Sequence, residues 1–233
     1  MKTIGLLGGM SWESTALYYK QINEQIKKEL GSLHSAKVVI VSVDFDEIEK
    51  LQHIAAWDET AEILSSAAKN IENANADFLL ICTNTMHKVV DKIKENINIP
   101  IVHIADATAE VLQDDGIKKI GLLGTAFTMQ EDFYKKRISD NYDIEVIVPS
   151  LEDIQIVHKI IYEELCLGII KDDSRKEYLR IIDSLTSRGC EGIILGCTEI
   201  CMLIKEEHTN IKLYDTTTIH AKEAVSKALD NNT

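Results

Sequence analysis

Small residues with hydroxyl, amide or thiol side chains gather at four places in the chain, each directly after an apolar run. The four segments are GGMS (8–11), TNT (83–85), GTAFT (124–128) and CTE (197–199). Ser, Thr and Asn at such positions cap helices in many α/β proteins. Helix N-termini also attract anions, so four converging helix starts would bind one small anion or dianion. The glycines form neither GxGxxG nor a P-loop, which argues against nucleotide binding.

Cys197 is the residue that we consider first as a reactive group. It follows an apolar run and opens the next segment. A thiol near a helix N-terminus has a lowered pKa, which favours the reactive thiolate. We assign Cys166, Cys190 and Cys201 to packing, the usual role of a small apolar residue, although Cys201 could also lie near the site. No His or Cys near Cys197 and Cys201 completes a zinc site, so we expect no metal.

The elements that must position these residues alternate between short apolar runs and amphipathic segments. Helical patterns follow the apolar runs, as at 12–29 and 60–73. Strands without polar alternation, each followed by a helix, are typical of a parallel sheet covered on both faces. The predicted strands are 4–8, 38–43, 78–82 and 99–104 in the first half and 120–124, 144–149, 192–196 and 211–215 in the second.

The two halves of the chain match each other residue by residue. IGLLG at 4–8 recurs at 120–124, and the same spacing pairs Tyr18 with Tyr134 in the following helix. It also pairs Lys20 with Lys136 and Ile22 with Ile138. Any two strand–helix units share apolar strands, but the matching helix residues exceed that background similarity. We therefore infer an internal duplication.

The duplication predicts an α/β fold with two pseudo-symmetric lobes, each a parallel sheet flanked by helices. Ligands in such sheets bind beyond the carboxyl ends of the strands, so we expect the active site in the cleft between the lobes. We place the first lobe at 1–114 plus 211–233 and the second at 115–210.

The repeat also indicates which residue stands in the position equivalent to Cys197. ADFLLICTNT (76–85) aligns with CEGIILGCTE (190–199), so Cys197 pairs with Thr83 and Cys82 with a glycine. Successive strand residues face opposite sides of a sheet. If Thr83 faces the cleft as Cys197 does, Cys82 points away into packing.

Composition excludes several classes of function. The net charge of −13 argues against a nucleic-acid or anionic-membrane binder, because either would need a basic face. No signal-peptide pattern and no apolar run of transmembrane length is evident. Five cysteines, an odd count without a CxxC pair, indicate reduced thiols. We therefore expect a cytoplasmic protein with neither nucleic acid nor membrane as a partner.

Several segments resemble the aspartate/glutamate racemase family, which also includes hydantoin racemases. They are GLLGGMSWEST (5–15), CTNTMHK (82–88), HIADAT (103–108), IYEELCLG (161–168) and GCTE (196–199). The resemblance covers nearly the whole chain, and GGMSWEST is similar to the aspartate racemase branch. It implies two α/β lobes and no pyridoxal phosphate or other cofactor. It also implies two cysteines, one per lobe, that exchange protons on opposite faces of the substrate α-carbon.

Carried onto this chain, the second of those cysteines is Cys197, and the first falls on Thr83. This is a departure from the family pattern, because a threonine does not ionise as readily as a thiol. The resemblance therefore implies a single-thiol enzyme that prefers one enantiomer, the L form, whose α-hydrogen faces the second-lobe cysteine. In glutamate racemases an acidic residue occupies the first loop and a His follows the second CT, whereas this chain has Met10 and Glu199 there.

The resemblance also assigns roles to the neighbouring residues. Asn84, Thr85 and Thr198 would hold the substrate carboxylate or amine, and Glu199 would orient groups beside Cys197. The residues expected to line the pocket are Met10, Ser11, Gln52, Thr125 and Thr128. For His87, His103, His158 and Lys159 we expect a capping or surface role.

These observations predict a cofactor-independent amino-acid racemase, an isomerase acting on aspartate, glutamate or both. Its partner would be a small acidic amino acid, and a homodimer is the one protein partner that we consider. Two alternatives stay open. One is a single-thiol decarboxylase or isomerase of the same fold. The other is a non-catalytic sensor of a small acidic ligand, which the missing thiol at Thr83 keeps in view.

Overall fold

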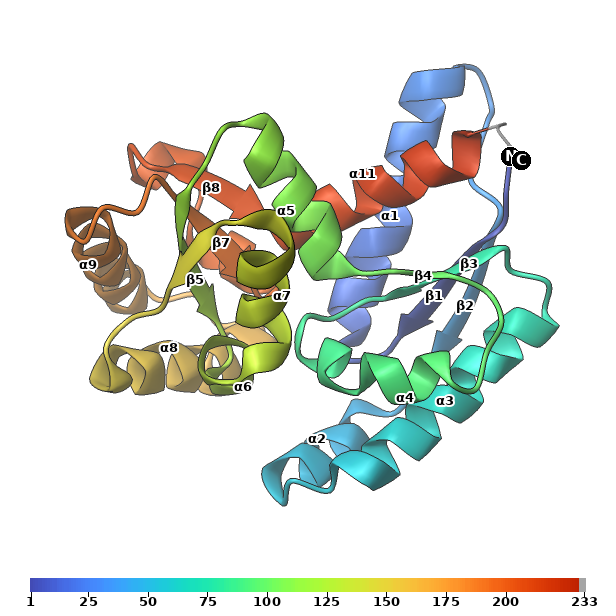
Figure 1. The fold of residues 1–233 in the computed structure, drawn as a ribbon, viewed down its shortest axis with the longest axis horizontal. Helices are drawn as coiled ribbons and strands as arrows, with labels where there is room; N and C mark the ends of the chain where they lie inside the picture. The colour runs from blue at the N-terminus through green and yellow to red at the C-terminus, as the bar shows by residue number, and fades with distance from the viewer. Residues whose placement is uncertain (231–233) are drawn as a thin grey trace. The chain divides into compact units, whose positions relative to one another are not determined.

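The first half of the chain forms a four-stranded parallel sheet with the order β2-β1-β3-β4. The structure is a computed structural model that describes residues 1–230 (Figure 1). The central strands β1 and β3 are buried along their whole length, which is why their sequences are apolar without alternation. The strands are β1 (Ile4–Gly8), β2 (Val38–Ser42), β3 (Phe78–Ile81) and β4 (Ile101–Val102).

Helices cover both faces of this sheet. Leu6 and Leu80 point toward α1 (Trp12–Leu30) and α11 (Thr216–Leu229) and pack in one apolar cluster. Leu7 and Leu79, one residue further along their strands, belong to the opposite cluster. The helices on that side are α2 (Phe45–His53), α3 (Trp57–Asn73) and α4 (Val90–Lys94), preceded by the 3-10 helix η1 (Thr85–Val89) (Figure 1).

The second half forms its own four-stranded parallel sheet, with the order β6-β5-β7-β8. Among its helices, α9 (Asp172–Ser187) contacts α8 (Leu151–Glu163) through Tyr178, whose hydroxyl donates to the Val157 carbonyl at 3.3 Å. The strands are β5 (Lys119–Gly124), β6 (Glu145–Ile147), β7 (Gly192–Gly196) and β8 (Lys212–Asp215). The helices are α5 (Ile104–Asp114), α6 (Ala126–Gln130), α7 (Asp132–Tyr142), α8 (Leu151–Glu163), η2 (Leu165–Leu167), α9 (Asp172–Ser187), α10 (Ile200–Leu203) and η3 (Glu206–His208).

The two sheets share one topology, in which the first strand of each lies between its second and third. Residues paired by the sequence repeat occupy similar environments: Tyr18 and Tyr134 are both fully buried, and Lys20 and Lys136 are both exposed. The predicted fold class, an α/β protein with two parallel sheets flanked by helices, is therefore confirmed.

The chain divides into its two units at residues other than those expected. The first unit holds residues 1–104 and the chain from His220, and the second holds 105–219. Strand β8 pairs with β7 in the second sheet, with Lys212 opposite Gly192, so the boundary expected at 211 moves into α11. Helix α5 belongs with the second unit because Asp106 accepts two hydrogen bonds from Arg137 of α7, at 2.6 and 2.7 Å. Among residues 1–230, no helix is both long and apolar enough to span a membrane.

Tyr18 provides a test of how α11 is held on the first unit. Its hydroxyl lies 2.8 Å from His220 Nδ1, and both residues are fully buried. We expect Tyr18→Phe to lower the free energy of unfolding by about 1–3 kcal/mol, because the buried Nδ1 loses its donor. Urea unfolding measures the change. Tyr19→Phe, at a position that is 49% exposed, is the matched control and should leave stability unchanged. Equal stability of the Tyr18→Phe and Tyr19→Phe variants would show that the Tyr18–His220 hydrogen bond does not stabilise the protein.

Candidate active site

The turn after β1 is shaped by two hydroxyl side chains of α1. Ser11 is the N-cap of the helix, and its Oγ accepts from the Ser14 backbone N–H at 3.3 Å. Thr15 Oγ1 accepts from the Gly9 N–H at 2.9 Å and donates to the Ser11 carbonyl at 3.0 Å. Gly9 has a φ of +94°, and a Cβ there would collide with the backbone of Val43. This turn therefore holds Met10 and Ser11 at the carboxyl end of β1.

Cys82 and Thr83 at the end of β3 have different surroundings. Cys82 is fully buried in the apolar cluster beneath α1 and α11, and burial raises the pKa of its thiol. Its carbonyl accepts from Ser14 Oγ at 3.0 Å. Thr83 is partly exposed, and Asn84 and Thr85 after it are buried. Strand alternation thus places Cys82 in packing, as the repeat register predicts.

Gln52, the remaining expected site residue of the first unit, is buried on α2 and is 3% exposed. In the second unit, Thr125 is the N-cap of α6. Its Oγ1 accepts from the Thr128 N–H at 3.3 Å and lies 3.2 Å from Thr128 Oγ1. His158 contributes to the same turn, because its Nδ1 accepts from the Ala126 N–H at 3.1 Å. This is the capping role expected for His158.

Cys197 forms a thiol–carboxylate pair with Glu199. Its Sγ donates to Glu199 Oε2 at 3.0 Å. Cys197 is partly exposed, whereas Thr198 and Glu199 are buried. The pKa of the Cys197 thiol lies well above its ordinary value, because burial, the Glu199 carboxylate and the nearby Cys166 all disfavour the thiolate.

The expectation of a lowered pKa at Cys197 is therefore wrong, and the local backbone gives the reason. Strand β7 is followed by a bend and a turn, and then by α10, which has only four residues and no side-chain cap. So short a helix offers little dipole to stabilise a thiolate, and a carboxylate is hydrogen-bonded to the sulfur. The segment after β3 likewise enters the 3-10 helix η1 without a side-chain cap. Of the four expected helix starts, only those at Ser11 and Thr125 are capped by their side chains.

A cluster of buried histidines in the first unit escaped the sequence analysis. His87 and His103, expected at caps or on the surface, are 1% and 6% exposed, and their rings lie 4.4 Å apart between centroids. His220 of α11 adds a third ring, 6.1 Å from that of His87. The three come from η1, from the residue after β4 and from the distant helix α11, so no spacing in the sequence links them.

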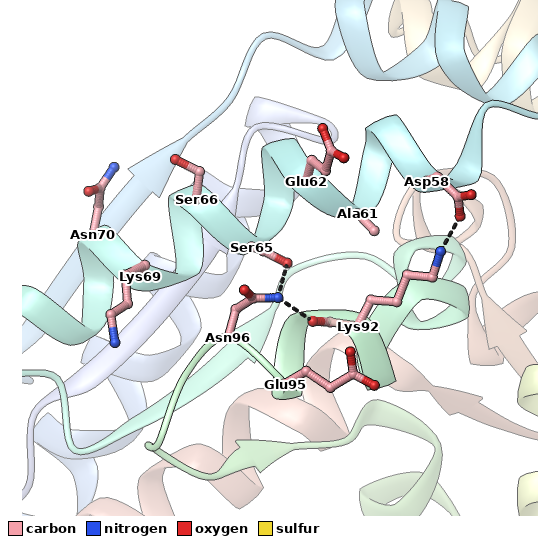
Figure 2. Close-up of a pocket in the computed structure, with 10 residues that line it drawn as sticks. All are labelled: Asp58, Ala61, Glu62, Ser65, Ser66, Lys69, Asn70, Lys92, Glu95 and Asn96. Atoms are coloured by element: carbon pink, nitrogen blue, oxygen red, sulfur yellow. Dashed lines mark hydrogen bonds and ion pairs between the residues drawn. The ribbon is translucent and has the colours of Figure 1, made fainter.

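A groove lies elsewhere, between α3 and α4 of the first unit (Figure 2). Its volume is about 770 Å³, and none of the expected site residues lines it. Its lysines are already paired, Lys92 with Asp58 and Lys69 with Glu72. Asn96 bridges its two helices by donating to Ser65 Oγ and to the Lys92 carbonyl. Within residues 1–230, no group of three or more His, Cys, Asp or Glu side chains could hold a metal ion.

A family model described as Asp/Glu/Hydantoin racemase matches residues 7–224. The chain belongs to this family. A candidate Asp/Glu racemase from Yersinia pestis has a crystal structure that is 50% identical, with a TM-score of 0.93 over 99% of this chain and 100% of that one. An aspartate racemase homologue from Pyrococcus horikoshii is 36% identical, with a TM-score of 0.84 over 99% and 100% of the two chains.

A curated relative that covers nearly the whole chain is also named as a racemase. The broad specificity amino-acid racemase RacX of Bacillus subtilis is 22% identical over 97% of this chain and 98% of its own length. Membership in the racemase family supports an amino-acid racemase, that is, an isomerase.

Cys82 tests the register of β3. We expect Cys82→Ala to keep most racemase activity and to lose roughly 1 kcal/mol of unfolding free energy, as for a small truncation in a core. Cys190→Ala is the matched control, since Cys190 is also buried and belongs to no expected site. Activity assays and urea unfolding on both variants measure the two effects. A folded Cys82→Ala protein without activity, beside an active Cys190→Ala protein, would make Cys82 a reacting group.

Substitution of Glu199 tests whether its carboxylate raises the pKa of the Cys197 thiol. Because its carboxylate disfavours the thiolate, Glu199→Gln should lower the pKa of the Cys197 thiol. The rate of alkylation by iodoacetamide, followed on the Cys197 peptide by mass spectrometry across pH, reports the thiolate fraction. The midpoint of that profile should move to lower pH in the variant. An unchanged or higher midpoint would show that Glu199 does not control the thiol.

Proposed function

We propose that this chain is a cofactor-independent racemase of aspartate, glutamate or both, with Cys197 as its base. The observation that carries the proposal is the hydrogen bond of 3.0 Å between the Cys197 thiol and Glu199. A thiol beside a carboxylate has an acceptor for its proton. Family membership supplies the reaction type, and the acidic substrate follows from the names of the Yersinia and Pyrococcus relatives.

Removal of an α-proton needs a strong base and a stabilised carbanion. The thiol proton moves to Glu199, and the Cys197 thiolate then takes the α-hydrogen of the L-amino acid. After water on the Thr83 face has given a proton to the carbanion, Glu199 returns its proton to water, which restores the starting state. A thiol with a raised pKa gives a more basic thiolate. The α-ammonium group of a bound substrate favours the thiolate, because an opposite charge nearby stabilises the ionised form. Asn84, Thr85 and Thr198 hold the substrate carboxylate or amine, while Met10, Ser11, Gln52, Thr125 and Thr128 line the pocket.

Thr83 acts on the opposite face of the α-carbon. Its hydroxyl does not ionise near neutral pH, so it delivers a proton through water or steadies the substrate. The two faces are therefore unequal, and the L enantiomer, whose hydrogen faces Cys197, is the preferred substrate. A thiol base needs reducing surroundings, which supports the cytoplasm as the place of action. A homodimer is the proposed assembly.

Hydrogen exchange in heavy water tests this assignment. The protein is incubated with each enantiomer of aspartate and glutamate, and the α-hydrogen is followed by NMR. We expect rapid exchange of L-aspartate or L-glutamate and slow exchange of the D forms. Cys197→Ser should abolish exchange with both enantiomers, because an alcohol cannot replace the thiolate as base.

Thr83→Cys is the gain-of-function partner of that variant and should raise turnover of the D form. Equal rates for both enantiomers in the unmodified protein, with Thr83→Ala harmless, would show that another group supplies the proton on the Thr83 face. Binding of an acidic amino acid without any exchange would instead identify a sensor, and loss of a carboxyl group from the substrate would identify a decarboxylase.

A further inference from the structure

His87 joins two separate backbone segments of the first unit through its two ring nitrogens. Its Nδ1 lies 2.9 Å from the carbonyl oxygen of Thr83, at the end of β3. Its Nε2 lies 3.3 Å from the backbone nitrogen of Ile104, where α5 begins. The ring is thus a bridge between the segment that carries Thr83 and the segment that follows β4.

These two contacts define the protonation state of the ring. The Thr83 carbonyl can only accept, so Nδ1 must carry a hydrogen. The Ile104 N–H can only donate, so Nε2 must keep its lone pair. The neutral tautomer with a hydrogen on Nδ1 is the one state that satisfies both. A proton added to Nε2 would face the Ile104 N–H and break the bridge.

The surroundings of His87 favour the same neutral state. The pKa of His87 lies well below its usual value because of burial and the proximity of His103 and His220. His220 is itself held neutral, with its pKa lowered to about 4 by burial. Its Nε2 donates to the Val102 carbonyl at 2.8 Å, and its Nδ1 lies 2.8 Å from the Tyr18 hydroxyl.

We propose that His87 is the residue that positions Thr83 for the proton transfer on its face of the substrate, acting through the Thr83 carbonyl as the neutral Nδ1–H imidazole. The inference rests on the proposed function. His87 is a positioning residue and not the proton donor, because both of its nitrogens are engaged by backbone groups. A hydroxyl that works through water tolerates little displacement, since a misplacement of about 1 Å costs roughly 100-fold in rate.

Two substitutions separate the two ends of the bridge. In His87→Asn the side-chain amide nitrogen occupies the position of Nδ1 and keeps the hydrogen bond to Thr83. In His87→Gln the amide oxygen reaches the position of Nε2 and keeps the bond from Ile104, but the bond to Thr83 is lost. Each variant replaces the buried ring by an amide and loses one backbone contact, so their structural costs are matched.

The readout is a partition ratio measured in heavy water with L-aspartate or L-glutamate. Deuterium appears in the L form when Cys197 returns a deuteron, and D product appears when the Thr83 face supplies one. We expect His87→Gln to lower the ratio of D product to deuterated L substrate by about 10- to 100-fold. His87→Asn should stay within a few-fold of the unmodified protein. Loss of folded protein would reduce both products together and leave the ratio unchanged.

The outcomes separate the inference from the function on which it rests. Absence of any exchange in the unmodified protein would overturn the proposed racemase. Exchange and racemisation with the same partition ratio in both variants would overturn the role of His87 alone. Nitrogen-15 NMR of the imidazole checks the tautomer independently of activity, and we expect a protonated Nδ1 and an unprotonated Nε2. The opposite tautomer, or a charged ring at neutral pH, would also overturn the inference.

Discussion

Burial of β1, β3, β5 and β7 on both faces is the constraint on which the chemistry of this protein depends. A strand inside a parallel sheet has apolar neighbours above and below, so a polar side chain along it would lose its hydrogen bonds to water. Polar and reactive groups are therefore confined to the strand ends. Cys197 follows β7 directly, and Thr83 lies two residues after the last residue of β3. One residue earlier, Cys82 is already inside the core.

At the end of β7, the charges around the Cys197 sulfur decide whether the thiol or the thiolate is favoured. Cys197 lies beside a carboxylate, and burial disfavours a second negative charge. The raised pKa favours the protonated thiol, so the proposed mechanism has to create the basic thiolate when the substrate is bound. This differs from a cysteine that a helix dipole keeps ionised, which is a better leaving group and a weaker base. The more basic sulfur suits the proposed removal of a weakly acidic α-hydrogen.

The first unit places buried histidines behind its strand ends. His87, His103 and His220 lie close together, and the hydrogen bonds of His87 and His220 match neutral tautomers. Charging one ring would put a cation in a buried site beside other imidazoles, which is costly. The cluster is therefore suited to hold backbone segments in place and not to exchange protons. In the proposed mechanism, the unit that carries Thr83 contributes position, and the unit that carries Cys197 contributes the base.

The sequence by itself determined the strands, the shared topology and the register of the repeat. Apolar periodicity and the alignment of ADFLLICTNT with CEGIILGCTE depend on local spacing, and strand alternation then placed Cys82 in the core. Only the tertiary structure decided which unit receives β8, how the histidines meet and in which direction the pKa of Cys197 moves. Each of these depends on groups from distant segments or on the length of a following helix. Pairing, burial and the electric field at an atom are set by its three-dimensional neighbours, and a linear pattern does not encode them.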